Sequence, residues 1–388
     1  MIKRVLLFIP SNKGTIASVS YNLYNALNDR NDIILKVVSL TNYTDSKLNF
    51  KQLESFESFE KNTFYLFKLL KRILWFKHIK KSYNPDITIN TLFICSIISV
   101  LSGGNDRKIG VFHSPHSQTL LKGKLAHLFS WFSYRFIYQR LDRLFCVSEE
   151  VRKSIENSFK NIPLNKLQTV YNIHNVDDIR RQSFEPIQKE YKHIFENPTI
   201  IYCGRLDKNK APERLYQSFS AISNSLANLQ LVFVGADNDS CWSTIKKQSE
   251  LDGLRERVHY LGTQLNPYCM IRNSSLLVSS SYSEGLPGVV IESLIIGTPV
   301  VSTNSSFGLW EIMSVEDKYD KNLSTVFFTS YGAITPNNDT GKNCHSKNDI
   351  IFLAEAILSI FENKIEITSF KFEEKINAEV VISNYLYE

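Results

Sequence analysis

Two glutamates in one glycine-rich stretch are the residues best placed for chemistry in this 388-residue chain. The stretch SSSYSEGLPGVVIES holds Glu284 among small residues, where no carboxylate is needed for packing, and Glu292 follows eight positions later. Carboxylates accept hydrogen bonds from hydroxyl groups, so the pair suits a sugar and a ribose. The bare spacing also fits two solvent-facing charges, so the surrounding residues must decide between the two interpretations.

Those surroundings favour a ligand that carries phosphate. Gly285 and Gly288 let backbone N–H groups approach a bound molecule closely. A helix is expected to begin near Pro287–Gly288, and the amides at a helix amino end hold anions. Together, the carboxylates and the helix start predict a nucleotide-sugar site.

The elements that position this stretch alternate between short apolar runs and helical patterns. Expected strands in the first half cover 5–9, 33–38, 86–89, 108–112, 143–147 and 167–170. Expected strands in the second half cover 198–203, 229–234, 258–261, 276–279, 299–302 and 325–328. Such alternation predicts an α/β fold with two doubly wound, Rossmann-like domains facing across a cleft, whose ligands bind at the carboxyl ends of the strands.

The expected domain boundaries follow from one linker. Residues 184–197, with Pro186 and mixed charge, separate a domain over 1–183 from a nucleotide-sugar-binding domain over 184–369. Apolar residues at helical spacing predict a C-terminal helix within 370–388.

The chain resembles the retaining GT-B glycosyltransferases of family 4, most strongly between Ile200 and Ile312. The matching segments, in order, are IIYCGRLDKNKAPERLYQSF, LVFVGADND, RVHYLGTQ and SSYSEGLPGVVIESLIIGTPVVSTNSSFGLWEI. Each segment alone is weak, but their order is specific. The resemblance implies a GT-B fold, sugar transfer with retention, and a C-terminal helix that returns to the first domain, which would bind the acceptor.

The resemblance also implies roles for particular residues. Arg205 and Lys210 would neutralise the donor diphosphate, as physics also favours, because charge builds on the leaving group. A plain ion pair with Asp207 or Glu213 is the alternative for this basic pair. Glu284 would orient the donor sugar and Glu292 would hold the ribose. The sugar-diphosphate pocket would be lined by Gly285, Leu286, Pro287, Gly288 and Val289.

The first half resembles the family more loosely. The loop after the first expected strand, PSNKGTIAS, has Gly14 where relatives often carry two glycines, and Lys13 could add charge. His113 in VFHSPHSQ corresponds to the family histidine that borders the reacting sugar, and domain closure would bring it over the donor. A satisfied core or loop histidine is the alternative.

No metal or cofactor is expected. His113 and His116 lack a carboxylate neighbour, and the triplet Asp237-Asn-Asp239 suits a turn. The six cysteines are widely spaced and form no CxxC pair, which indicates reduced thiols in a cytoplasmic protein. No GxGxxG follows an expected strand, which argues against a dinucleotide oxidoreductase.

Charge is divided unevenly along the chain. Residues 1–198 hold 29 lysines and arginines against 17 acidic residues, although the net charge of the whole chain is only +6. The segments 63–82 and 120–143 interleave basic with aromatic and aliphatic residues, as interfacial helices do. These segments predict contact with an anionic membrane, and the alternative is that their aromatics pack into the core. No nucleic-acid-binding motif is present.

The resulting hypothesis is a transfer of a hexose or N-acetylhexosamine to a lipid-linked saccharide in bacterial surface polysaccharide synthesis (O-antigen, capsule or lipopolysaccharide). The EGLPG form is more like family members that use UDP-sugars. The protein would be cytoplasmic, at the inner face of the membrane. Two alternatives stay open at this point: a nucleotide-sugar epimerase of the same fold, and a non-catalytic membrane- or glycan-binding protein.

Overall fold

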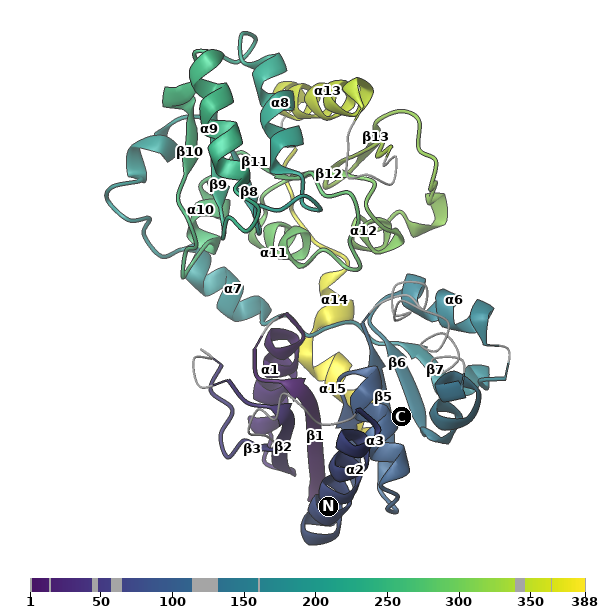
Figure 1. Ribbon diagram of the computed structural model, residues 1–388. Coiled ribbons are helices and arrows are strands. Elements are labelled where there is room, and N and C mark those ends of the chain that lie inside the picture. Colours follow the sequence, from purple (N-terminus) through teal and green to yellow (C-terminus); the bar gives the residue numbers. More distant parts are fainter. Residues whose placement is uncertain are drawn as a thin grey trace. The chain divides into compact units, whose positions relative to one another are not determined.

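The computed structural model describes residues 2–13, 15–43, 48–56, 65–113, 132–159, 161–338, 346–363 and 365–387. The chain forms two compact units, one of residues 1–175 with 374–388 and one of residues 176–373 (Figure 1). The sequence placed the boundary between residues 183 and 184, whereas residues 176–183 form a helix that packs within the second unit.

The first unit is built on a seven-stranded parallel sheet in the order β3-β2-β1-β4-β5-β6-β7. Its strands are β1 (Lys3–Ser11), β2 (Ile33–Thr41), β3 (Glu54–Ser55), β4 (Ile87–Asn90), β5 (Arg107–Phe112), β6 (Arg143–Cys146) and β7 (Leu167–Thr169). Its helices are α1 (Thr15–Asn28), α2 (Tyr65–Tyr83), α3 (Phe93–Leu101), the short η1 (Ser133–Ile137), η2 (Tyr138–Arg140) and η3 (Leu164–Lys166), α6 (Glu149–Ser158), α14 (Glu373–Ile376) and α15 (Ala378–Tyr387).

Both faces of this sheet carry buried apolar side chains, because successive residues of a strand point to opposite sides. Val5, Leu7 and Ile9 of β1 belong to one apolar cluster, while Leu6 and Phe8 belong to a second cluster that includes residues of α2 and α3. Helix α15 returns to the first cluster, where the ring of Tyr385 meets Phe145 edge-on at 5.0 Å. The C-terminal segment 374–388 is therefore part of the first unit.

The second unit repeats the arrangement with the order β10-β9-β8-β11-β12-β14-β13, in which only β13 runs antiparallel to its neighbour. Its strands are β8 (Thr199–Cys203), β9 (Gln230–Val234), β10 (Val258–Tyr260), β11 (Leu276–Ser279), β12 (Val300–Thr303), β13 (Phe327–Thr329) and β14 (Gly332–Thr335). Its helices are α7 (Val176–Ser183), α8 (Pro212–Ile222), α9 (Cys241–Leu251), α10 (Tyr268–Arg272), α11 (Gly288–Ile296), α12 (Phe307–Ile312) and α13 (Lys347–Asn363), with short turns η4 (Lys192–Glu196), η5 (Arg255–Arg257) and η6 (Glu316–Lys318).

The buried strand β14 was not predicted from the sequence. The expected strand at 325–328 corresponds to the edge strand β13, but β14 lies between it and β12 and is fully buried. Gly332 begins β14 with a positive φ of 139°, and a Cβ there would lie 1.8 Å from the Val300 carbonyl oxygen. The strand therefore needs glycine, which weakens its apolar pattern in the sequence.

The predicted α/β class with two doubly wound sheets is confirmed in both units. In both sheets the first strand of the unit lies inside the sheet, and the strand order runs outward from it on both sides, which is the doubly wound topology. Across the described residues, the structure contains no helix with the length and apolar character required to cross a bilayer.

Candidate active site

An ion pair between two neighbouring strand ends forms the centre of the candidate site. Lys210 lies in the loop after β8, and Glu284 lies in the loop after β11, the strand that pairs with β8. The Lys210 ammonium contacts the Glu284 carboxylate, and the two side chains keep 23% and 14% of their exposure. The pair is thus shielded in part from water yet open to a ligand. The sequence nominated both residues but gave no sign that they touch.

Hydrogen bonds between the two loops hold this pair in place. The Tyr282 amide donates to the Asn209 carbonyl at 2.8 Å, and the Asn209 side-chain amide donates to the Ser283 carbonyl at 2.9 Å. The Ser280 hydroxyl lies 3.0 Å from the carbonyl oxygen of Lys210. Asn209 and Ser280 thus position the site, and the sequence analysis missed both because their partners are distant in the chain.

The loop after β8 is shaped by Asp207. Its carboxylate accepts the Lys210 amide at 2.9 Å, and its carbonyl accepts the Ala211 amide at 3.0 Å. Ala211 takes a left-handed conformation with φ of 48°, which turns the chain into α8. Arg205 pairs with Asp207 at 3.2 Å and keeps 61% of its side-chain exposure. The expected alternative for Arg205, an ion pair with Asp207, is therefore present, and the guanidinium is still accessible.

A fully buried arginine lies beneath the loop after β11. Arg214 of α8 donates to the Ser280 carbonyl, its guanidinium lies 4.5 Å from the centre of the Tyr282 ring, and it donates to the Asn337 side chain at 2.9 Å. The Asn337 amide in turn donates to the Tyr282 carbonyl at 2.7 Å. Hydrogen bonds to charged groups are stronger than neutral ones, so Arg214 fixes the backbone that carries Glu284.

The predicted lining residues 285–289 lie between Glu284 and α11. The Glu284 amide donates to the Ser305 carbonyl at 3.1 Å. At Gly308, in the first turn of α12, a Cβ would lie 2.5 Å from the Gly285 carbonyl oxygen, so the start of α12 packs closely on this segment. Helix α11 begins at Gly288, after Pro287, so its first backbone amides follow Glu284 by only a few residues in the sequence. Gly285, Leu286, Pro287, Gly288 and Val289 are thus placed as one short segment at the start of the helix.

Glu292 lies about one turn into α11, with a partner that the sequence did not suggest. Burial raises the pKa of Glu292 to about 7, while a hydrogen bond with the Tyr268 side chain favours the ionised form. Tyr268 begins α10, where the Asn266 side chain accepts the Tyr268 amide at 3.0 Å. Glu292 can therefore change its protonation state near neutral pH, and Tyr268 biases that change.

The triplet Asp237-Asn-Asp239 serves as turn chemistry. The Asp237 carboxylate accepts the amides of Cys241 and Trp242 at the start of α9, at 2.9 and 3.3 Å. The Asp239 carboxylate accepts the Lys208 amide at 2.9 Å. Both carboxylates thus satisfy backbone donors. In the described ranges, no cluster of three or more His, Cys, Asp or Glu side chains has the geometry to hold a metal ion.

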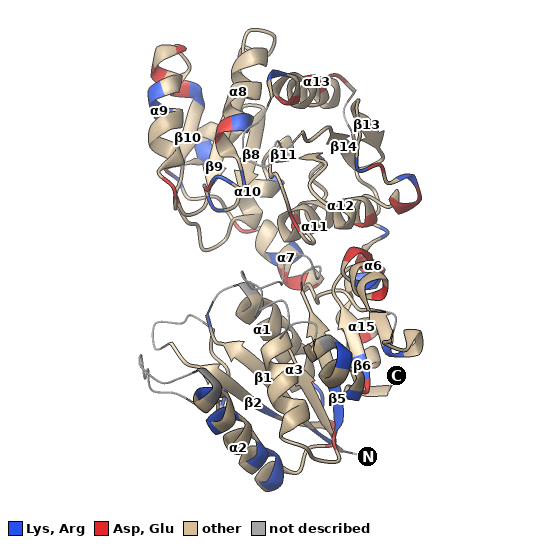
Figure 2. Cartoon of the chain, turned by 45° about the vertical axis from the view of Figure 1, so that its right-hand side comes forward, with Lys and Arg blue, Asp and Glu red and all other residues tan. Residues whose placement is uncertain are grey.

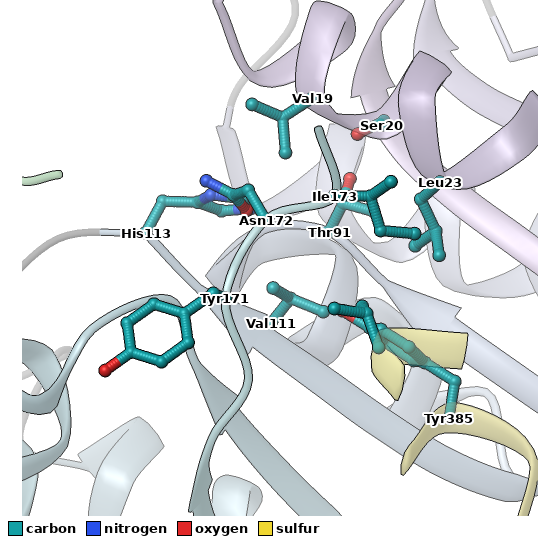
Figure 3. A pocket seen from close by; sticks show the side chains of 11 residues that line it. Val19, Ser20, Leu23, Thr91, Val111, His113, Tyr171, Asn172, Ile173 and Tyr385 are labelled. Atoms are coloured by element: carbon teal, nitrogen blue, oxygen red, sulfur yellow. The ribbon is translucent and has the colours of Figure 1, made fainter. Parts of the chain in front are cut away.

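His113 belongs to the first unit, directly after β5. Its Nε2 atom is buried and has no hydrogen-bond partner among the described residues, and burial lowers the pKa of the imidazole to about 4. Figure 3 shows it beside Asn172 and Tyr171 at a small cavity. The cavity of about 20 Å³ has room for about one water molecule, not a sugar ring. Gly14 and His116 lie outside the described residues.

Comparison with known proteins assigns the family. The model of the glycosyl transferases group 1 matches residues 183–321, and the model of glycosyltransferase family 4 matches residues 17–178. An uncharacterized glycosyltransferase of Methanocaldococcus jannaschii is 28% identical over 278 residues, covering 69% of this chain and 68% of that protein. The N,N'-diacetylbacillosaminyl-diphospho-undecaprenol alpha-1,3-N-acetylgalactosaminyltransferase of Campylobacter jejuni is 24% identical over 317 residues, covering 74% and 80%.

A solved structure agrees on the fold. The crystal structure of Anabaena Alr3699/HepE in complex with UDP matches with a TM-score of 0.70 and 14% identity, covering 98% of this chain and 95% of that one. The two units therefore have the GT-B fold. The chain belongs to the family 4 glycosyltransferases and is a transferase.

Proposed function

We propose that this glycosyltransferase moves a hexose or N-acetylhexosamine from a UDP-sugar to a lipid-linked saccharide, with retention of the anomeric configuration. The reaction would serve the synthesis of a bacterial surface polysaccharide such as O-antigen, capsule or lipopolysaccharide. The observation that carries the proposal is the Lys210–Glu284 pair, set beside Arg205 and the start of α11 at the carboxyl ends of β8 and β11.

Each part of this arrangement has a role in breaking the bond between the sugar and the diphosphate. Negative charge grows on the leaving diphosphate, so the Lys210 ammonium and the Arg205 guanidinium stabilise the transition state more than the ground state. Backbone amides at the start of α11 add to this effect. These cations do what a metal ion does in other transferases, so we propose no metal cofactor.

The two glutamates would hold the neutral parts of the donor. Glu284 lies next to Lys210, where its carboxylate can accept hydrogen bonds from sugar hydroxyls while Lys210 contacts the phosphate. Glu292 lies about one turn into α11, where its carboxylate would accept hydrogen bonds from the ribose hydroxyls. When the donor binds, Lys210 and Glu284 would therefore contact the ligand as well as each other.

Retention would follow from attack on the face that the diphosphate leaves. The acceptor oxygen bonds to the anomeric carbon as the bond to the diphosphate oxygen breaks, and the acceptor proton passes to the departing phosphate oxygen. The Glu284 carboxylate is held by Lys210, which supports a positioning role for it and not one as a nucleophile.

The relatives support the choice of donor and acceptor. The Campylobacter jejuni relative is named for transfer to a diphospho-undecaprenol-linked sugar, and the Anabaena structure holds UDP. A lipid-linked acceptor is presented at a membrane, so we propose that the basic first half meets an anionic membrane surface on its inner face.

The test is ligand-dependent thermal unfolding of the purified chain, followed by transfer assays. UDP and its sugars should raise Tm, because a ligand that binds only the folded state stabilises it. Stabilisation by GDP but not by UDP would overturn the choice of donor. Conversion of a UDP-sugar to an epimer without any acceptor would indicate an epimerase instead.

A further inference from the structure

We propose that Asn172 is a positioning residue for His113 and acts on it through one water molecule in the small cavity that both side chains line. The inference rests on the proposed transfer, in which His113 would border the reacting sugar. It is carried by the ring nitrogens of His113, by the cavity and by the uncharged residues around it.

The two ring nitrogens of His113 have different surroundings. Burial lowers the pKa of the imidazole, and a hydrogen bond with the Thr91 backbone opposes this effect. A partner that favours the protonated ring is an acceptor, so the ring donates to the Thr91 carbonyl. Nε2 is buried and has no partner among the described residues, so the donor is Nδ1, and Nε2 of the neutral ring holds a lone pair.

Asn172 lines the same cavity from a segment that is fixed on α1. The Asn22 side chain of α1 donates to the Ile173 carbonyl at 3.1 Å, next to Asn172 in the chain. Figure 3 shows the Asn172 side chain beside the imidazole of His113. Because Nε2 has no partner among the described residues, the Asn172 amide does not bond it directly, and a contact between the two needs a bridging molecule.

One water molecule suits this place. A buried water needs about 10–15 Å³ of space and two to four polar partners, and the cavity has about 20 Å³. Nε2 of His113 can accept one proton of the water, and the Asn172 amide can accept the other or donate to the water oxygen. The Ser20 hydroxyl also lines the cavity, and because it donates to the Ile16 carbonyl at 2.7 Å, its oxygen can accept.

Among the described residues, no charged side chain lines the cavity. Helix α1 has no charged residue (Figure 2), and β4 has none either. The titratable groups besides His113 are two phenols, Tyr171 and Tyr385, and burial raises the pKa of Tyr385. The Lys375 ammonium lies 5.9 Å from the centre of the Tyr171 ring. The remaining lining residues are apolar, namely Val19, Leu23, Val111, Ile173 and Val381.

The water would hold the imidazole in the state that transfer needs. With Nδ1 bound to the Thr91 carbonyl and Nε2 bound to the water, the ring keeps one orientation and stays neutral. Nε2 is then available to accept a hydrogen bond from a hydroxyl of the reacting sugar. Asn172 would therefore affect transfer through the orientation and protonation of His113, and not through donor binding.

The experiment is an NMR titration of the full chain with isotope-labelled histidine, combined with transfer kinetics. The signals of His113 are assigned by their loss in His113→Gln. In the unchanged chain they should show a proton on Nδ1 and a pKa of about 4. Asn172→Asp keeps the shape of the side chain and places a carboxylate near Nε2, so the pKa of His113 should rise by about 1–3. A new ionisation between about pH 5 and 7 should then lower kcat as the pH falls, because a protonated Nε2 cannot accept.

Asn172→Leu removes the amide at similar size. We expect kcat to fall about tenfold, as for the loss of one hydrogen bond, with KM for the UDP-sugar changed by less than about twofold. The UDP-induced rise in Tm should stay unchanged, because the candidate donor residues lie in the second unit. A lowered Tm with unchanged kcat would show that Asn172 supports only the fold, and would overturn the proposal.

The matched control is Asn175→Asp, which makes the same change at an exposed position three residues further along the chain. This variant should keep the His113 titration and the kcat of the unchanged chain. A His113 pKa that stays at about 4 in Asn172→Asp would overturn the proposal. A proton on Nε2 in the unchanged chain would overturn it as well. If Asn172→Leu does not fold, the titration of Asn172→Asp still decides.

The NMR titration also separates this inference from the proposed function, because it needs no sugar transfer. A raised His113 pKa in Asn172→Asp, in a chain that transfers no sugar, would overturn the proposed function and leave the link between Asn172 and His113 supported. Sugar transfer together with an unmoved titration would do the reverse.

Discussion

The two units share one topology but differ in how their candidate residues are held. In the second unit, Lys210 and Glu284 come from loops that are tied together by backbone and side-chain hydrogen bonds. In the first unit, His113 has a buried nitrogen without a partner among the described residues, beside a cavity that holds about one water. The Lys210–Glu284 pair is therefore in place without a ligand, whereas the described residues around His113 leave space for about one water.

That difference suggests a division of labour. A preassembled cluster of charges stabilises a transition state without reorganisation, which suits the common donor chemistry of the family. The first unit would instead supply what varies among relatives, namely the acceptor and the surface that presents it. Substitutions in the two units should therefore affect binding and transfer in different ways.

The largest effect is expected at the ion pair. Lys210→Met should lower kcat/KM by about 100- to 1000-fold, because it removes a charge next to the leaving diphosphate. Glu284→Gln should lower it to a similar extent. Sugar transfer from radiolabelled UDP-sugar measures the change, and Lys208→Met, two residues away and exposed, is the control. Transfer within threefold of the unchanged chain would remove Lys210 and Glu284 from the site.

His113→Ala should distinguish most clearly between an effect on transfer and an effect on donor binding. Transfer should fall by about 100-fold, the lower end for a group that assists proton or charge movement, while the UDP-induced rise in Tm stays unchanged. Because the pKa of His113 is lowered to about 4, the imidazole is neutral at assay pH, and no His113 titration should appear between about pH 5 and 8. Loss of the response to UDP would show that His113 supports the fold or the donor site instead.

Gly308→Ala should displace the segment 285–289, although Gly308 itself is not proposed to contact the donor. Its Cβ would lie 2.5 Å from the Gly285 carbonyl oxygen, so the backbone must shift at a cost of about 1–3 kcal/mol. UDP affinity, measured by calorimetry, should fall by about tenfold. Unchanged affinity together with a lowered Tm would mean that the segment 285–289 does not contact the donor.

Arg205→Ala should have a smaller effect than Lys210→Met, about tenfold in KM for the UDP-sugar. Arg205 is largely exposed and already paired with Asp207, so solvent screens its charge. An effect as large as that of Lys210→Met would show that Arg205 becomes shielded when the donor binds.

The smallest expected effect is a pH dependence of UDP binding. The pKa of Glu292 is about 7, so raising the pH from 6 to 8 ionises the carboxylate and should tighten UDP binding by up to about tenfold. Glu292→Gln should remove this part of the dependence, leaving that of UDP itself. Tyr268→Phe removes a hydrogen bond that favours ionisation and should move the midpoint to higher pH. An unmoved midpoint would mean that Tyr268 does not position Glu292.

Local patterns predicted the elements well where a strand is an uninterrupted apolar run, as at Val5–Ile9 and Leu229–Val234. They failed at β14, where Gly332 is required for close backbone packing and breaks the run. They also placed the domain boundary eight residues late, since the amphipathic α7 fits either side and only its contacts with α10 and α11 assign it.

The sequence by itself determined the types and order of the candidate donor residues, because a glycine-rich turn, a helix start and their carboxylates are adjacent in the chain. Only the tertiary structure decided that Lys210 meets Glu284 across 74 positions and that Tyr268 contacts Glu292. The physical reason is that parallel pairing of β8 with β11 brings two strand ends together, and pairing between distant strands leaves no mark in local spacing.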